Sequence, residues 1–137
     1  MNLDLYLDKH AHIKEELSAI STLIDSKITP GTAEQIADRI NHLSGMLLMH
    51  LASEDKYLYP VLLASNNTEI KALTEKYMKE MGSIAASYSS LKEKYHTPSA
   101  ILGNTPEFIT SAMTVISAIT ERIAREENEL YVYAAKL

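Results

Sequence analysis

An imidazole and a carboxylate stand four residues apart at His50 and Glu54. On a helix, this spacing places both side chains on one face, one turn apart. Such a pair can hold one metal ion between the helices of a bundle. An altered copy follows at Arg122 and Glu126, with the same spacing. The comparison of the two copies is therefore the main indication of function in this chain.

The two copies continue alike, because each glutamate is followed by a second acid and then by a Leu-Tyr pair. This shared ending indicates that the two halves of the chain are related helical hairpins. Polar residues in the middle of apolar stripes also need a reason, because a buried charge is costly unless it is paired or binds a metal. The polar residues predicted to face inward and to meet at mid-bundle are His10, His50, Glu54, Arg122 and Glu126.

Composition limits the class of protein. With 137 residues, 46% hydrophobic and 23% charged, the chain suits one domain over residues 1–137. The net charge of -5 and the lack of a basic cluster argue against nucleic acid and acidic membrane surfaces as partners. The absence of cysteine excludes disulfides, thiol catalysis and cysteine-held clusters. No apolar run is long enough to span a membrane, and an acidic start does not suit a signal peptide, so we expect a cytoplasmic protein.

Apolar residues recur at three and four along nearly the whole chain, which predicts amphipathic helices. The turn signal Thr29-Pro30-Gly31 and the break Asn66-Asn67-Thr68 separate the first three. No useful stretch alternates with period two, which argues against strands. The predicted fold is all-α, an up-down-up-down four-helix bundle, with helices over about residues 3–24, 32–65, 68–95 and 105–130.

Several local expectations accompany this fold. Pro60 should kink the second helix or end it nearby, because proline lacks the N–H and crowds the preceding turn. Residues 96–104 are expected to form the longest loop, with Thr105 as the cap of the next helix. Gly45 and Gly82 lie inside helices, and we expect close helix approach to be the reason. Four tyrosines are expected to pack inward with hydroxyls that reach polar partners, and they are Tyr57, Tyr77, Tyr88 and Tyr131.

The remaining histidines are predicted to lie outside the polar cluster. His12 faces roughly 200° around the helix from His10. His42 lies two turns from His50, and His96 is placed to complement a helix dipole. Most of the methionines are expected to fill gaps in the core.

At these residues the chain resembles the hemerythrin-like family, the HHE cation-binding domains, over nearly its whole length. The strongest match is on the second helix, where the family carries His-x-x-x-Glu, an acid and Leu-aromatic-Pro, and the chain has His50, Glu54, Asp55, Leu58, Tyr59 and Pro60. On the first helix the family has a histidine followed by apolar residues three, seven and ten later, matched by His10, Ile13, Leu17 and Ile20. The fourth helix matches a second His-x-x-x-Glu-Glu at Arg122, Glu126 and Glu127.

Two positions depart from the family pattern. Met81, with Ile84, Tyr88 and Leu91 behind it, and Arg122 stand where the family uses histidine. The resemblance implies two irons bridged by carboxylates, with the first- and second-helix histidines serving one iron and the other histidines serving its partner. The chain then keeps the ligands of one iron, which are His10, His50, Glu54 and Glu126. Two imidazoles and two carboxylates suit iron(II), manganese or zinc.

Two arrangements of this site remain open. In the first, which we favour, one metal lies at the histidine side and Arg122 takes the place of the other. In the second no metal binds, and Arg122 is salt-bridged to Glu54 and Glu126 in a structural or regulatory bundle. A dinuclear or heme arrangement, in which Met81 would be an axial ligand, and a tyrosine that completes the site are further alternatives.

The resemblance also implies a range of functions. Members of the family bind oxygen, sense oxygen or nitric oxide, handle iron, or protect against oxidative and nitrosative stress. Reversible binding of oxygen as peroxide needs one electron from each of two irons, so loss of one iron's histidines argues against oxygen carriage. Metal-dependent sensing or stress response is the first interpretation. The second interpretation is a metal-free bundle that interacts with another molecule, and the third is a metalloenzyme that removes peroxide. Of these, we favour a protein that is not an enzyme. No protein partner is predicted.

Overall fold

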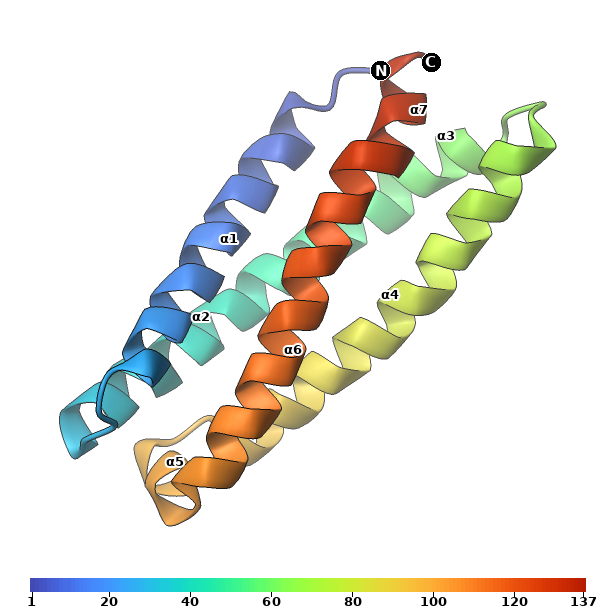
Figure 1. Ribbon diagram of the computed structural model, residues 1–137. Helices are drawn as coiled ribbons and strands as arrows, with labels where there is room; N and C mark the ends of the chain where they lie inside the picture. The colour runs from blue at the N-terminus through green and yellow to red at the C-terminus, as the bar shows by residue number, and fades with distance from the viewer.

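The computed structural model describes residues 1–137 and is helical throughout, with no strand. The elements make four long rods, of which the second and fourth are each built from three consecutive segments. Neighbouring rods run antiparallel (Figure 1). This confirms the predicted all-α bundle. No helix is long and apolar enough to cross a membrane. The segments are α1 (Asp4–Asp25), α2 (Pro30–Ser53), the π-helix η1 (Glu54–Leu58), α3 (Tyr59–Leu63), α4 (Thr68–Tyr95), α5 (Pro98–Gly103), α6 (Thr105–Arg125), the π-helix η2 (Glu126–Leu130) and α7 (Tyr131–Ala135).

Helix starts follow the capping signals in the sequence. Thr29 and Thr32 form a reciprocal capping box at the start of α2, with Pro30 in the first turn. The Asn67 side chain accepts hydrogen bonds from the backbone N–H groups of Glu69 and Ile70 at the start of α4. The cap of α6 is Asn104 rather than Thr105, so the expected start was wrong by one residue.

The expected loop over residues 96–104 is also partly wrong, because it contains the short helix α5. Thr97 caps that helix by accepting a hydrogen bond from the Ala100 N–H, and Pro98 occupies the first turn. Ile101 of α5 is fully buried in the core. Ile101 therefore helps to close this end of the bundle.

A wide turn of π-helix follows each of the two motifs. In η1 the Tyr59 N–H bonds to the Glu54 carbonyl, and in η2 the Tyr131 N–H bonds to the Glu126 carbonyl. A π turn places residues five apart on one face, and such turns are frequent at functional sites. The second rod continues past Pro60 and ends at Leu63. It therefore ends near the proline, as expected.

These turns change which tyrosines face inward. Tyr57 is 56% exposed, so its predicted inward packing was wrong. Tyr59 and Tyr131, five residues after the two glutamates, are both buried. The prediction assumed a constant step of 100° per residue. Each π turn contains one extra residue, so beyond it this step assigns the inward face to the wrong residue.

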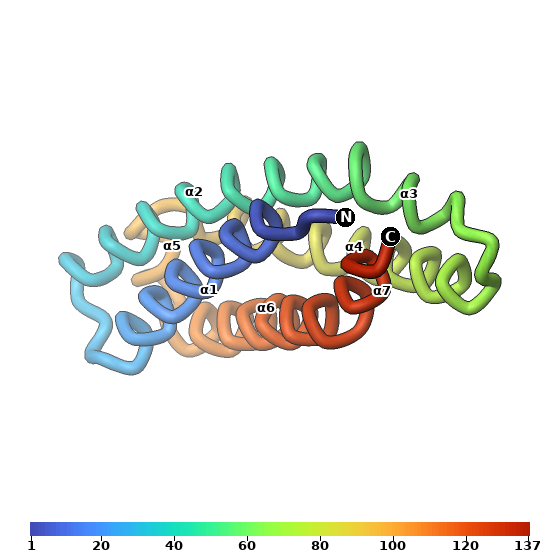
Figure 2. Tube along the Cα trace, turned by 90° about the horizontal axis from the view of Figure 1, so that it is seen from above, coloured from blue at the N-terminus to red at the C-terminus, as the bar shows by residue number.

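The core has two apolar clusters with a polar layer between them. The larger cluster includes Ile13, Leu43 and Ile123 and extends to Phe108 at the α5 end. The smaller cluster includes Tyr6 and lies near the two termini, which Figure 2 shows close together. His10 stands between Tyr6 and Ile13 on α1, so the polar layer separates the two clusters.

The two helix-interior glycines do not mark close helix approach. A Cβ atom added at Gly45 or at Gly82 would meet no atom within 4 Å. The expectation was therefore wrong.

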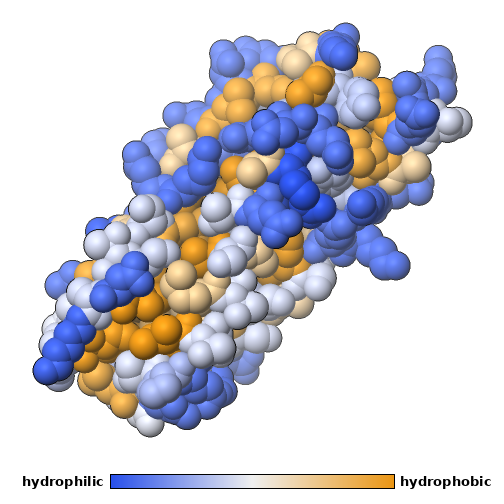
Figure 3. All heavy atoms as spheres, in the orientation of Figure 1, coloured by the Kyte–Doolittle hydropathy of each residue, from blue (hydrophilic) through white to orange (hydrophobic).

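Figure 3 shows hydrophilic side chains gathered across the middle of one face, where α6 runs beside α4.

Candidate metal centre

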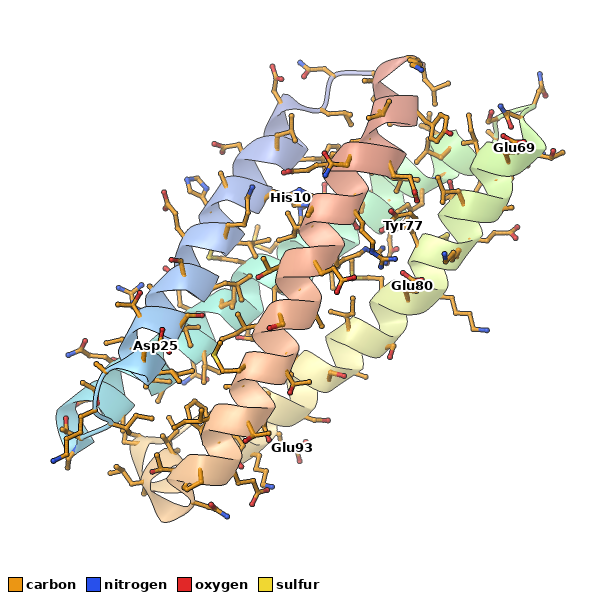
Figure 4. All side chains as sticks on the ribbon, in the orientation of Figure 1. His10, Asp25, Glu69, Tyr77, Glu80 and Glu93 are labelled. Atoms are coloured by element: carbon orange, nitrogen blue, oxygen red, sulfur yellow. The ribbon has the colours of Figure 1, made fainter.

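Four side chains from three of the rods meet in the polar layer. His10 comes from α1, His50 from α2, Glu54 opens η1 and Glu126 opens η2. None of the four residues is more than 5% exposed. Each offers one ligand atom, and these four atoms lie within 4.8 Å of one another. The structure thus brings together all four residues predicted as metal ligands. Figure 4 shows His10 directed from α1 into the interior of the bundle.

The distances between ligand atoms within this group are short. His50 Nε2 lies 2.8 Å from Glu54 Oε1, and His10 Nε2 lies 3.2 Å from Glu126 Oε2. Yet His50 Nε2, Glu54 Oε1 and Glu126 Oε2 are buried atoms without a hydrogen-bond partner. Buried polar atoms in proteins nearly always have a partner. Atoms left without one and directed at a common centre suit a cation, and imidazole with carboxylate is a ligand set for iron, manganese or zinc.

The His10 ring is held on both sides. Its Nδ1 lies 3.1 Å from Glu127 Oε1, which leaves Nε2 directed at the centre. An imidazole that bonds a carboxylate through one nitrogen and faces a metal with the other is a recurring arrangement in metal sites. The Tyr131 ring stacks on the His10 ring, with centroids 5.1 Å apart and planes 6° apart. The Tyr131 hydroxyl lies 3.2 Å from His10 Nε2 and donates to Glu54 Oε2 at 3.2 Å.

The two buried carboxylates differ in their electrostatic surroundings. Burial raises the pKa of Glu54 above its ordinary value, and the adjacent His50 only partly opposes this. Burial acts on Glu126 in the same sense, but His10 and the Arg122 charge together hold its pKa below the ordinary range. For His10, burial alone would lower the pKa, and the neighbouring carboxylates raise it instead. The negative charge of Glu54 is thus less well compensated by neighbouring positive groups than that of Glu126.

Arg122 is 2% exposed and fills the side of the layer that faces α4. Its Nε donates to Glu126 Oε1 at 2.9 Å, and one Nη2 proton goes to the Tyr77 carbonyl at 2.8 Å. The guanidinium also lies over the Tyr77 ring, 4.4 Å from its centroid. The predicted pairing with Glu126 is present. Arg122 forms no ion pair with Glu54, and instead Nη1 reaches Glu80 at 3.5 Å.

Glu80 extends this network to the surface of the bundle. Arg125 Nη2 donates to Glu80 Oε2 at 2.6 Å, and the Tyr77 hydroxyl donates to Glu129 at 3.0 Å. Figure 4 shows Tyr77 and Glu80 on the side of α4 that faces α6. Sequence reasoning missed Glu80, because this partly exposed residue is not one of the apolar residues of the α4 stripe. Tyr59 was also missed as a partner of Arg122, and its hydroxyl accepts from Nη2 at 3.4 Å.

A small cavity of about 40 Å³ adjoins the centre. His10, His50 and Glu126 form its polar end, and the apolar remainder comes mainly from α2, α4 and α6. Met81 is half-buried on α4 and lines this cavity with Arg122. A water molecule needs at least roughly 10–15 Å³, so the cavity has room for a molecule of two or three atoms.

The other three histidines lie outside the centre, as expected. His12 and His42 are exposed. His96 is exposed at the end of α4, where its Nδ1 lies 3.2 Å from the Lys92 carbonyl. Of the four tyrosines predicted to reach polar partners, Tyr77, Tyr88 and Tyr131 do so.

Comparison with known proteins gives one family. The family model described as the hemerythrin HHE cation binding domain matches residues 1–134. No curated protein matches the chain, and no solved structure matches it.

Proposed function

The chain belongs to the hemerythrin HHE cation-binding family, and we propose that its single domain, residues 1–137, holds one metal ion, with iron as the first choice and manganese or zinc as alternatives. The ligands are His10, His50, Glu54 and Glu126. The observation that carries this proposal is the convergence of buried atoms without hydrogen-bond partners. His50, Glu54 and Glu126 each contribute such an atom. A bound cation would supply the compensation that these atoms lack.

One ion rather than two is supported by Arg122. Its guanidinium is a fixed charge that already pairs with Glu126 on the α4 side of the layer. Met81, on the same side, offers a thioether where the family pattern has an imidazole. A second cation there would meet a like charge within a few ångströms in a poorly screened interior.

The physiological role that suits this site is metal-dependent sensing of oxygen or nitric oxide, or a response to oxidative stress. Iron, when bound, supplies a redox-active centre that small diatomic molecules can bind. The adjoining cavity is small and mainly apolar away from the ligand residues, which favours an uncharged ligand of that size. A single iron cannot provide the two electrons of reversible peroxide formation, so oxygen carriage is not proposed.

Metal analysis tests this proposal. Protein purified without chelators and loaded with iron under air should contain one equivalent of metal. A His50→Ala variant should lose that metal. A His42→Ala variant is the matched control, because His42 lies on the same helix but is exposed, and it should keep the full equivalent.

A metal-free bundle is the competing candidate, and a specific contact favours it. The buried pair of Arg122 and Glu126 is complete without an ion. This hypothesis predicts that the wild type stays metal-free after loading with iron, manganese and zinc. That result would overturn the metal-binding proposal.

A further inference from the structure

The Tyr131 side chain is only 2% exposed and projects into the polar layer from the start of α7. Its hydroxyl lies 3.2 Å from His10 Nε2 and 3.2 Å from Glu54 Oε2. We propose that Tyr131 supplies a fifth donor, its phenol oxygen, to an iron ion held by the two histidines and two glutamates. This inference rests on the proposed function.

The separations are those of atoms that share one ion. Ligand atoms bonded at about 2.1 Å to one metal ion lie about 3 Å apart when their bonds meet at right angles. The Tyr131 oxygen has nearly this separation from two of the proposed ligands. His10 Nε2 and Glu126 Oε2 are also 3.2 Å apart. The phenol oxygen therefore belongs to the same group of converging atoms.

Glu127 shows what a supporting residue does at this site. It contacts Nδ1 of His10, the nitrogen that faces away from the centre. Tyr131 contacts Nε2, the nitrogen that faces the centre. Its ring is also stacked nearly parallel to the imidazole, which fixes the phenol beside the His10 ring. Tyr131 is thus placed as a ligand rather than as a support for one.

The π turn explains why a tyrosine has this position. Glu126 and Tyr131 are joined by the five-residue hydrogen bond of η2, which brings both side chains to the inward face. Tyr59 follows Glu54 in the same way, and it is buried too. Its hydroxyl, however, accepts from Arg122. Tyr59 is therefore the matched control for Tyr131.

The donor set that results has two nitrogens and three oxygens. Without an ion, the Tyr131 hydroxyl donates a hydrogen bond to Glu54 Oε2. With iron(III) bound, the Tyr131 oxygen would bind as a phenolate beside the two carboxylates. A site with three anionic oxygens would stabilise iron in its oxidised state, which suits a centre that records exposure to an oxidant.

Optical and resonance Raman spectra of the iron-loaded protein test this inference. A tyrosine phenolate bound to iron(III) gives a visible charge-transfer absorption, and excitation in that band enhances phenolate ring vibrations. Both signals are expected in the wild type and in Tyr59→Phe, and both should disappear in Tyr131→Phe. Iron content is measured in parallel, and circular dichroism shows whether each variant is folded.

The outcomes separate this inference from the proposal on which it rests. Wild type that contains one iron(III) but shows no phenolate vibrations overturns the role of Tyr131 and leaves the metal site standing. Signals that persist in Tyr131→Phe also overturn it, since another tyrosine would then be the ligand. Wild type that takes up no iron overturns both. If Tyr131→Phe fails to fold, the wild type and Tyr59→Phe decide the matter together, because phenolate signals that are absent from the wild type, or that disappear in Tyr59→Phe, overturn the role of Tyr131.

Discussion

Arg122 and His10 share one carboxylate. The guanidinium Nε lies 2.9 Å from Glu126 Oε1, while Glu126 Oε2 lies 3.2 Å from His10 Nε2. Glu126 therefore divides the polar layer into two sides. One side holds the fixed positive charge of Arg122, and the other side offers ligand atoms for a metal ion. The number of metal ions that the bundle can hold should depend on this division.

Restoring both histidines of the family pattern should raise the metal content. We expect the double variant Met81→His/Arg122→His to bind two equivalents of iron where the wild type binds one, because the fixed charge is gone and two imidazoles replace it. Iron content per chain, measured after anaerobic loading and gel filtration, checks this. Met81→His alone is the control and should stay at one equivalent, because the Arg122 charge remains. A second equivalent in that single variant would contradict the role given to Arg122.

Removing the Arg122 charge should destabilise the metal-free protein. In Arg122→Met, Glu126 keeps its burial but loses a hydrogen-bonded partner, and breaking such a buried pair costs about 3–5 kcal/mol. The free energy of unfolding in urea, measured with a chelator present, should fall by this order. Arg39→Met is a control of the same chemistry, because Arg39 forms a part-exposed ion pair with Glu16, and it should cost less than about 1 kcal/mol. Equal losses in the two variants would mean that burial does not set the cost.

The Glu80 pair should contribute a stability that depends on pH. The hydrogen bond from Arg125 holds the pKa of Glu80 below its ordinary value of 4.5. The contribution is therefore fully present above the unfolded-state pKa and is lost as the pH falls through the lower folded-state value. Because Glu80 is partly exposed, Glu80→Gln should cost no more than about 1 kcal/mol at pH 7. Urea midpoints at pH 7 and at pH 3 should show the difference between variant and wild type shrinking in acid, and a difference that grows in acid would contradict the assignment.

Gly82 should be replaceable at no packing cost. A Cβ atom at this position meets nothing within 4 Å, and alanine is favoured over glycine inside a helix by about 1 kcal/mol. Gly82→Ala should therefore raise the melting temperature by a few degrees. Ser83→Ala, at the next exposed position of the same helix, is the control for a general preference for alanine and should gain less. A loss of stability in Gly82→Ala would mean that the glycine is needed for a contact that forms in another state of the protein.

The fold could be predicted because four amphipathic stripes and their capping residues agree with one another. The position of the stripes also predicted which of the polar residues face inward, so His10, His50, Glu54 and Glu126 could be named together. Periodicity did not predict the rotation of side chains after each glutamate. Tyr57 was expected inside and lies outside, because a constant step of 100° does not allow for a five-residue turn.

Partners across helices were harder to predict than faces. In the metal-free alternative Arg122 was expected to pair with Glu54 and Glu126, whereas it pairs with Glu126 and Glu80. A helical stripe gives the direction of a side chain but not the height or the rotation of the opposite helix. The long guanidinium can then reach any of several carboxylates, and only packing decides among them.

The two π turns also set the tolerance of the chain to changes in length. If Asn128 were deleted from η2, Tyr131 would stand four residues after Glu126, and the turn could close as an ordinary α-helix with both side chains still on the inward face. The extra residue of a π turn is therefore a place where the chain can lose one residue and keep the phenol in the interior. A single-residue deletion in the regular part of α6 would instead rotate the residues on its two sides by about 100° relative to each other, and Glu126 and Tyr131 would no longer face the polar layer in register with the start of the helix.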